Sequence, residues 1–162
     1  MKIVIGSDHG GFELKEDLKH LLSERSLEVV DMGTDSESPV DYPDIGGVVA
    51  EKVSAGEFER GVLICGTGIG MSIVANRFPG VRAALCQDVF TARLSREHND
   101  SNLLVLGGRT TGKGLAREIF AVWLETKFQG GRHERRLEKI HRLETKINEE
   151  KINDKKINRG KS

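Results

Sequence analysis

Short apolar runs alternate along most of this chain with longer stretches in which apolar residues recur at helical spacing. We expect the short runs, which are rich in valine, isoleucine and leucine, to be β-strands at residues 2–5, 27–31, 61–65, 81–86 and 102–106. Because these runs are nearly continuous rather than alternating, both faces of the resulting sheet should be covered. This pattern is typical of a parallel sheet with crossover helices.

The longer stretches predict helices at residues 12–25, 45–55, 71–78, 88–97 and 113–127. In the first of them, Leu14, Leu18, Leu21 and Leu22 fall on one helical side. Regular alternation of strand and helix predicts an α/β protein, a three-layer Rossmann-like doubly wound fold with a five-stranded parallel sheet. Ligands of such folds bind beyond the carboxyl ends of the strands, so polar residues in those turns are the candidates for chemistry.

The C-terminal part follows a different pattern. Apolar residues first keep helical spacing, at Leu137, Ile140, Leu143 and Ile147. They predict an extra helix over 132–148 that buries its apolar stripe. The letters KIN then recur every five residues, a step that turns about 140° around a helix and so forms no stripe. We expect residues 1–148 to form the functional domain and 149–162 to be a disordered charged tail, with a docking or addressing role as the alternative.

Composition narrows the class of protein. The chain has 162 residues, 37% of them hydrophobic, and its 25 basic side chains balance 25 acidic ones. This composition predicts a single soluble domain without the charge excess of a nucleic-acid-binding or membrane-surface protein. We see no signal peptide and no apolar run of membrane-spanning length, so the expected location is the cytoplasm.

The segment 62–77, VLICGTGIGMSIVANR, is the most informative for chemistry. A strand ends in Cys65, and a glycine-rich turn and a helix start follow. Backbone N–H groups in such a turn favour a thiolate and a bound anion. The alternative interpretation is a tight turn next to a small buried thiol. Cys86 ends another strand-like run without metal-ligand spacing, and we interpret it as a core residue rather than a redox partner of Cys65.

Further polar residues follow the first and fifth expected strands, close the fourth helix or open the last: Asp8, His9, Arg109, His98, Asn99, Arg132 and Arg136. Each has a structural interpretation as a helix cap, a helix end or a solvated charge. Together they supply an acid, a base, an imidazole and several cations at positions that one pocket can collect, so their combination predicts an active site.

These residues lie in six motifs that resemble the type B ribose-5-phosphate isomerases and the related galactose-6-phosphate and allose-6-phosphate isomerases. The motifs are GSDHGG at 6–11, VDYPD at 40–44, ICGTGIGMSIVANR at 64–77, LSREHND at 94–100, LGGR at 106–109 and GGRHERR at 130–136. The resemblance extends over about the first 147 residues, and only the tail falls outside it. Members without the cysteine use a carboxylate elsewhere, which Cys65 makes unnecessary here.

The resemblance implies that ribose 5-phosphate and ribulose 5-phosphate are interconverted through an enediolate. Cys65 would be the base, and Thr67 with the backbone N–H groups of Gly66, Gly68, Ile69 and Gly70 would receive the enediolate oxygen. By the same resemblance, His98 would open the sugar ring, Asp8 would help move protons and Asn99 would bind the sugar.

The phosphate would be held by four residues. Arg132 and Arg136 are four positions apart on the last helix, and guanidinium groups suit phosphate oxygens. His9 and Arg109 would complete this clamp by resemblance. The motifs contain no convergent set of metal ligands, so we expect no metal and no cofactor. The resemblance also implies a homodimer with shared active sites, Cys65 working with His98 of the other chain, or a dimer of such dimers.

Other functions remain open at this stage. The alternative substrate is a six-carbon sugar phosphate, allose 6-phosphate or galactose 6-phosphate, since one CHOH unit separates these sugars from ribose 5-phosphate. A Cys–His acyl-transfer enzyme would use Cys65 as a nucleophile, and a sugar-phosphate sensor would bind without turnover. A dinucleotide-binding module is disfavoured because GTGIGM lacks the full glycine fingerprint and a suitably placed acid.

Overall fold

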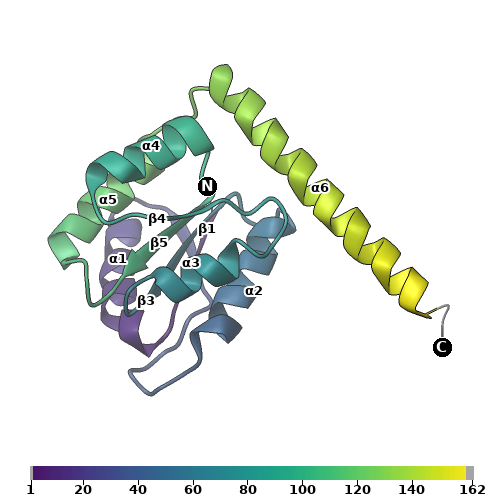
Figure 1. Cartoon of the computed structure of the whole chain (residues 1–162). Coiled ribbons are helices and arrows are strands. Elements are labelled where there is room, and N and C mark those ends of the chain that lie inside the picture. The colour runs from purple at the N-terminus through teal and green to yellow at the C-terminus, as the bar shows by residue number, and fades with distance from the viewer. Residues whose placement is uncertain (1, 160–162) are drawn as a thin grey trace. The chain divides into compact units, whose positions relative to one another are not determined.

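A computed structural model describes residues 2–159 of the chain, which divides into two compact units, Met1–Phe128 and Gln129–Ser162 (Figure 1). The first unit contains a five-stranded sheet in the order β2-β1-β3-β5-β4. Every pairing between neighbouring strands is parallel. The strands are β1 (Lys2–Ser7), β2 (Glu28–Asp31), β3 (Arg60–Cys65), β4 (Ala83–Leu85) and β5 (Leu103–Gly107). The predicted α/β fold with a five-stranded parallel sheet is confirmed.

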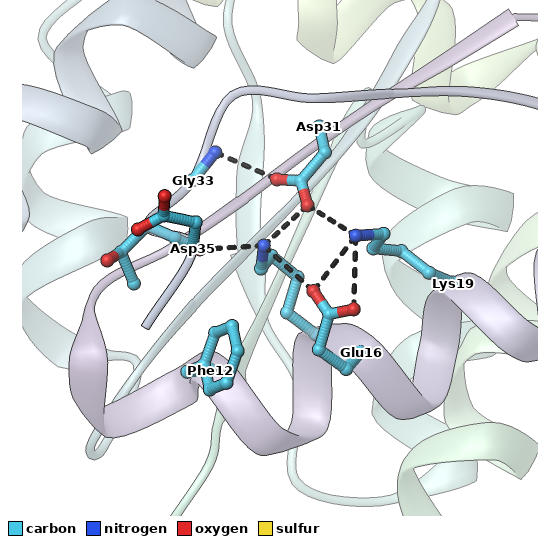
Figure 2. A pocket seen from close by; sticks show the side chains of 8 residues that line it. Phe12, Glu16, Lys19, Asp31, Gly33 and Asp35 are labelled. Carbon is cyan, nitrogen blue, oxygen red and sulfur yellow. Dashed lines mark hydrogen bonds and ion pairs between the residues drawn. The ribbon is translucent and has the colours of Figure 1, made fainter. Parts of the chain in front are cut away.

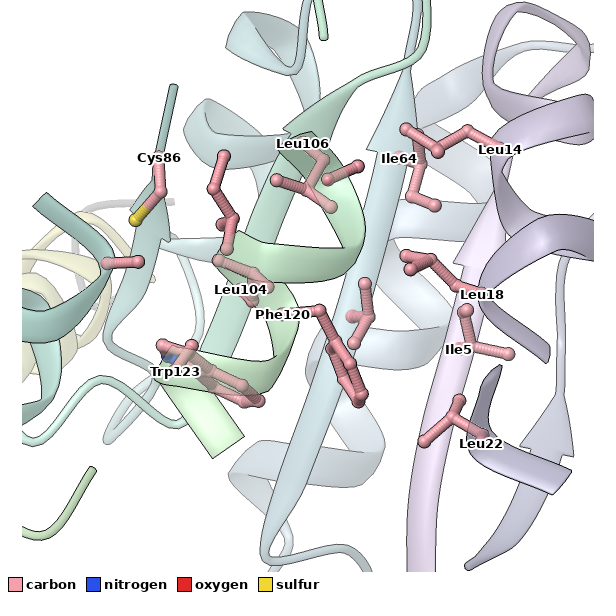
Figure 3. Close-up of a cluster of buried hydrophobic side chains, with 14 of the residues drawn as sticks. Ile5, Leu14, Leu18, Leu22, Ile64, Cys86, Leu104, Leu106, Phe120 and Trp123 are labelled. Atoms are coloured by element: carbon pink, nitrogen blue, oxygen red, sulfur yellow. The ribbon is translucent and has the colours of Figure 1, made fainter. Parts of the chain in front are cut away.

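Helices connect the strands and cover both faces of the sheet (Figure 1). They are α1 (Phe12–Glu24), α2 (Tyr42–Ser54), α3 (Ile69–Ala75), α4 (Val89–Asn99) and α5 (Lys113–Glu125), and a short 3-10 helix, η1 (His9–Gly11), precedes α1. One buried cluster joins α1 and α5 to the sheet, and the other joins α2 and α3 to its opposite face. In the first cluster, α1 and α5 contribute Leu14, Leu18, Leu22, Phe120 and Trp123 (Figure 3).

Alternation along the strands decides which layer each side chain meets. In β3, Ile64 packs into the cluster of α1 and α5, while Cys65 packs into the cluster of α2 and α3. The central strands β1, β3 and β5 are buried, as their continuous apolar runs predict. The edge strands β2 and β4 are only half covered, because each has a neighbouring strand on one side alone.

Several strand and helix boundaries in the first unit differ by one to three residues from the sequence expectation, and α2 and β4 are two examples. Helix α2 begins at Tyr42 rather than at residue 45, with a proline in its first turn, where its missing N–H costs no hydrogen bond. Strand β4 begins at Ala83 rather than at residue 81. The chain still turns at Gly80, whose φ is +73°, and Val81 N–H donates to the carbonyl of Phe78 (3.1 Å).

The second unit contains helix α6 (Arg132–Arg159). This helix continues past the expected end at residue 148 and through the repeated KIN units. Lysine and glutamate favour helix, and neither glycine nor proline interrupts the stretch. Ile140, Leu143 and Ile147 are exposed in the single chain rather than buried. The disorder expected for residues 149–162 stays a prediction, and residues 160–162 lie outside the described part.

Candidate active site

The turns that follow β1, β3 and β5 meet at the carboxyl edge of the sheet. Asp8 N–H donates to the carbonyl of Ile64 (3.2 Å), which ties the first turn to the end of β3. On the other side of β3, Gly108 N–H donates to the carbonyl of Cys65 (2.8 Å) and Arg109 N–H to that of Gly66 (2.9 Å). The chain order reverses between β1 and β3, and such switch points are where doubly wound folds bind ligands.

Cys65 lies at the centre of this arrangement. Cys65 is the last residue of β3 and is only 5% exposed. Its Sγ accepts a hydrogen bond from Gly68 N–H (3.2 Å). The contact places a backbone donor directly on the sulfur. The turn depends on glycine, because Gly68 has a φ of +78° and an added Cβ would lie 2.5 Å from Leu85 Cδ1.

The loop between Cys65 and α3 places exposed groups beside the sulfur. Thr67 is exposed, and its hydroxyl accepts from Ile69 N–H at 3.4 Å. The ring of Tyr42 lies against Gly70, where an added Cβ would come within 2.7 Å of ring atoms Cε2 and Cζ. Our assignment of site residues missed Tyr42, although its VDYPD motif was a signal that could have found it. The aromatic ring packs against one side of the loop between Cys65 and α3.

The turn after β1 contributes Asp8 and His9. Asp8 is almost fully buried, and its Oδ1 accepts a hydrogen bond from Gly11 N–H (3.1 Å). Asp8 is therefore the N-cap of η1, as its structural interpretation from the sequence expected. The turn is packed closely on the loop after β3, since a Cβ at Gly10 would lie 3.0 Å from Gly66 N. His9 Nδ1 accepts from Val40 N–H (3.2 Å), which brings the segment before α2 to the same place.

Arg109 brings a positive charge to the same edge. Its side chain lies across Gly66, where an added Cβ would be 3.6 Å from Arg109 Cδ and 3.7 Å from Nε. The residue is exposed, and none of the ion pairs found among the described residues involves it. Its guanidinium is thus available to an anion that enters beside the cysteine loop.

His98 and Asn99 lie elsewhere in the chain. They end α4, which runs from the carboxyl end of β4 back to the amino end of β5. Arg82, which precedes β4, donates from Nε to the carbonyl of Asn99 (3.0 Å) and to that of Asp100 (2.9 Å). These contacts fix the end of α4 at the amino edge of the sheet, opposite to Cys65.

Arg132 and Arg136 belong to the second unit. Both are exposed in the first turns of α6, four residues apart and so on one helical face. Arg132 Nε donates to His133 Nε2 (3.2 Å). The two units are described separately, so the contribution of these arginines to the site stays a prediction.

Other features bear on the sequence expectations. Cys86 is 99% covered in the core, and burial raises the pKa of its thiol to about 11, which confirms its interpretation as a core residue. Among the side chains that the structure describes, no group of three or more histidine, cysteine or acidic residues is arranged to hold a metal ion. Within the same described residues, no helix is both long enough and apolar enough to cross a membrane.

Comparison with known proteins decides the family. The Ribose/Galactose Isomerase family matches residues 3–140. The chain belongs to this family. Ribose-5-phosphate isomerase B of Escherichia coli is 47% identical over 147 residues, which are 91% of this chain and 99% of that protein. The solved structure of Clostridium thermocellum Ribose-5-Phosphate Isomerase B is 54% identical, has a TM-score of 0.89, and matches 91% of this chain and 99% of its own.

A second solved structure extends the likeness within the ribose/galactose isomerase family. The Thermotoga maritima ribose 5-phosphate isomerase is 52% identical with a TM-score of 0.84, matching 87% of this chain and 97% of its own. The family match ends at residue 140, within α6. Apart from Lys2, the described strands and the three turns around Cys65 therefore lie inside the family match, whereas the repeated KIN units lie beyond it.

Proposed function

We propose that this family member interconverts ribose 5-phosphate and ribulose 5-phosphate, with Cys65 as the base. The observation that carries the proposal is the hydrogen bond from Gly68 N–H to Cys65 Sγ, made between the turns that hold Asp8 and Arg109. The close relatives named ribose-5-phosphate isomerase support the same substrate.

The proposed reaction moves one proton between neighbouring carbons. The Cys65 thiolate takes the proton from C2 of the open-chain aldose, and the electron pair of that C–H bond forms the C1–C2 double bond of the enediolate. The C1 carbonyl oxygen gains the negative charge, which Thr67 and the N–H groups of residues 66–70 stabilise. A proton passes from the C2 hydroxyl to the C1 oxygen, and the thiol returns its proton to C1 as the C2 oxygen becomes a carbonyl, so no covalent intermediate and no redox cofactor are required.

Ring opening requires a second acid and base, which we assign to His98 with help from Asp8, while Asn99 binds the sugar. Within one chain the end of α4 and the end of β3 lie at opposite edges of the sheet, and β5 alone separates those edges by roughly 16 Å. We therefore infer that the site is shared, with His98 and Asn99 of the partner subunit entering beside Cys65. Exposed apolar residues on α3, Ile69 and Ile73, are consistent with a covered surface next to the site.

The assembly that we propose is a homodimer with two such sites, and a dimer of dimers is the larger alternative. A dimer would also bury Ile140, Leu143 and Ile147 of α6, which are exposed in the single chain. We assign the phosphate to His9, Arg109, Arg132 and Arg136, since imidazole and guanidinium donors fit its oxygens. With both of its cysteines free thiols, the protein suits a reducing compartment, and we infer a cytoplasmic location.

Turnover of a set of sugar phosphates tests the function. We expect kcat/KM to be highest for ribose 5-phosphate and lower for allose 6-phosphate and galactose 6-phosphate, because the pocket must accommodate one more CHOH unit. A clear preference for a six-carbon substrate would move the proposal to that substrate. Binding without turnover would support a sensor instead, and a stable acyl-enzyme with an activated ester, seen as a mass increase on Cys65, would support acyl transfer.

A further inference from the structure

Away from the reacting groups, α1 buries a charged side chain. Lys15 is 1% exposed, and its Nζ contacts Asp31 Oδ2 (2.5 Å), the carbonyl of Thr34 (2.8 Å) and Glu16 Oε1 (3.0 Å). An ammonium group has three N–H donors, so each of them has an acceptor within the protein. Figure 2 shows the carboxylates of Asp31 and Glu16 turned toward each other in this cluster. The same residues line a cavity of about 330 Å³.

The cluster holds the start of the segment that joins β2 to α2. Asp31 ends β2, and its other carboxylate oxygen accepts from Gly33 N–H (2.9 Å). Thr34 is fixed from two sides, since its carbonyl accepts from Lys15 and its N–H donates to the carbonyl of Ser7 (2.9 Å). Ser7 immediately precedes Asp8. The segment is thus fastened between α1 and the end of β1.

The other end of this segment reaches the candidate site. Val40 N–H donates to His9 Nδ1 at 3.2 Å. A backbone N–H can only donate, so Nδ1 is the acceptor and a neutral ring carries its proton on Nε2. His9 therefore presents an N–H donor on the side of the ring that points away from Val40. Pro39 restricts the backbone just before Val40, which helps to transmit the position of the segment.

We propose that Lys15 is a positioning residue of the site, which fixes the segment between β2 and α2 so that Val40 holds His9 with Nε2–H directed to the phosphate of the substrate. The identity of that ligand rests on the proposed function. The orientation of the His9 imidazole does not depend on the proposed function, because it follows from the contacts of Lys15, Thr34 and Val40 alone. Lys15 acts through His9 and touches no reacting atom.

The test compares Lys15→Met with Asp31→Asn and with the control Lys52→Met. Methionine keeps the length of the Lys15 side chain and removes its donors. The milder Asp31→Asn keeps the shape of the partner and weakens its bond to Lys15. Lys52 lies on α2 and forms an exposed ion pair with Glu57 (2.9 Å). Its replacement also removes one positive charge, but at a place distant from the segment between β2 and α2.

Two readouts separate positioning from a general loss of stability. One is the pair of ¹⁵N chemical shifts of the His9 ring, assigned with a His9→Gln variant, which report which nitrogen carries the proton. The other is the division of any defect between KM and kcat. We expect Lys15→Met to show a mixture of His9 tautomers and a KM for ribose 5-phosphate raised about three- to tenfold, with kcat little changed.

Asp31→Asn should shift both readouts in the same direction by a smaller amount, and Lys52→Met should match the wild type. Unaltered His9 signals in either folded variant would overturn the proposal, as would a raised KM without a change at His9. If Lys15→Met does not fold, Asp31→Asn decides by the same criteria. If the wild type turns over no sugar phosphate, the proposed function fails, while the His9 spectrum still tests the role of Lys15.

Discussion

Cys65 and His98 lie at opposite edges of the same sheet within one chain. Cys65 ends β3 at the carboxyl edge, whereas the residue after His98, Asn99, has its carbonyl bonded by Arg82 just before β4 begins. All strands are parallel, so these two positions mark the two ends of the sheet. This separation supports the proposed site, in which the two side chains come from different chains.

Mixing two inactive variants tests this relationship directly. Cys65→Ala and His98→Ala chains, once exchanged, should form mixed dimers in which one site carries both defects and the other carries neither. Random exchange makes half of the dimers mixed, so about a quarter of wild-type activity should return. Subunit exchange is verified by native mass spectrometry. Activity no greater than the sum of the separate variants would place both residues in one chain's pocket.

Replacement of the candidate base should separate binding from turnover. Cys65→Ala should keep sugar-phosphate affinity and lose most of kcat, because the proton acceptor is removed while the phosphate contacts stay. Iodoacetamide should inactivate the wild type, and substrate should slow this inactivation. Affinity is measured by calorimetry and turnover by a coupled assay.

Cys86 provides the matched control for this experiment. Its thiol is buried in the core, and burial raises its pKa to about 11, so it carries little thiolate at neutral pH. Cys86→Ala should therefore keep turnover and sensitivity to iodoacetamide. Near-normal turnover by Cys65→Ala would exclude Cys65 as the base.

The phosphate clamp predicts a substrate-dependent defect. Arg136→Ala should lower kcat/KM for ribose 5-phosphate by roughly ten- to a hundredfold, since a charge-assisted hydrogen bond contributes about 1.5 to 3 kcal/mol. The defect should shrink for ribose without phosphate. Arg142→Ala, an exposed residue paired with Glu138 on the same helix, should have little effect. An equal defect on both sugars would make Arg136 structural.

Truncation tests the part of α6 that lies beyond the family match. A stop after Asn148 should leave activity and the thermal midpoint nearly unchanged, because a solvated helical end adds little to the stability of the folded domain. A stop after Gly131 should abolish activity, since it removes Arg132 and Arg136. Both truncations are measured by scanning calorimetry and by turnover. A large loss of activity or of thermal midpoint on the stop after Asn148 would show that the repeated KIN units pack against the folded protein.

Asp31 predicts a change of stability in acid. Burial acts to raise the pKa of this carboxyl, but hydrogen bonds from Lys15 and Lys19 outweigh it and hold the pKa below its usual value. Its stabilisation is thus complete above the unfolded pKa, near 4, and is lost as pH falls through the lowered folded pKa. In urea unfolding, the stability difference between the wild type and Asp31→Asn should be largest at neutral pH and shrink below about pH 4.

An exposed carboxylate provides the comparison for this pH profile. Glu57 forms its ion pair with Lys52 at the surface, where solvent screens the charges. Glu57→Gln should therefore follow the wild-type dependence of stability on pH. A constant difference between the wild type and Asp31→Asn over the whole range would show that the Asp31 contacts do not depend on its charge.

The sequence by itself determined the fold class and the local chemistry around Cys65. Continuous apolar runs predicted the central strands, and the order of strand, thiol and glycines predicted the turn in which Gly68 N–H meets the sulfur. Both depend on neighbours along the chain, which is why local pattern was sufficient. The motifs also identified the family, because six of them occur in the same order.

Tertiary structure decided what depends on segments far apart in sequence. Only the packed chain shows that His98 lies across the sheet from Cys65, because strand order and the path of α4 fix their separation. The ring of Tyr42 against Gly70 and the contact of Val40 with His9 likewise join remote segments. Sequence spacing carries no information about such pairs, since side chains meet only after the layers have packed.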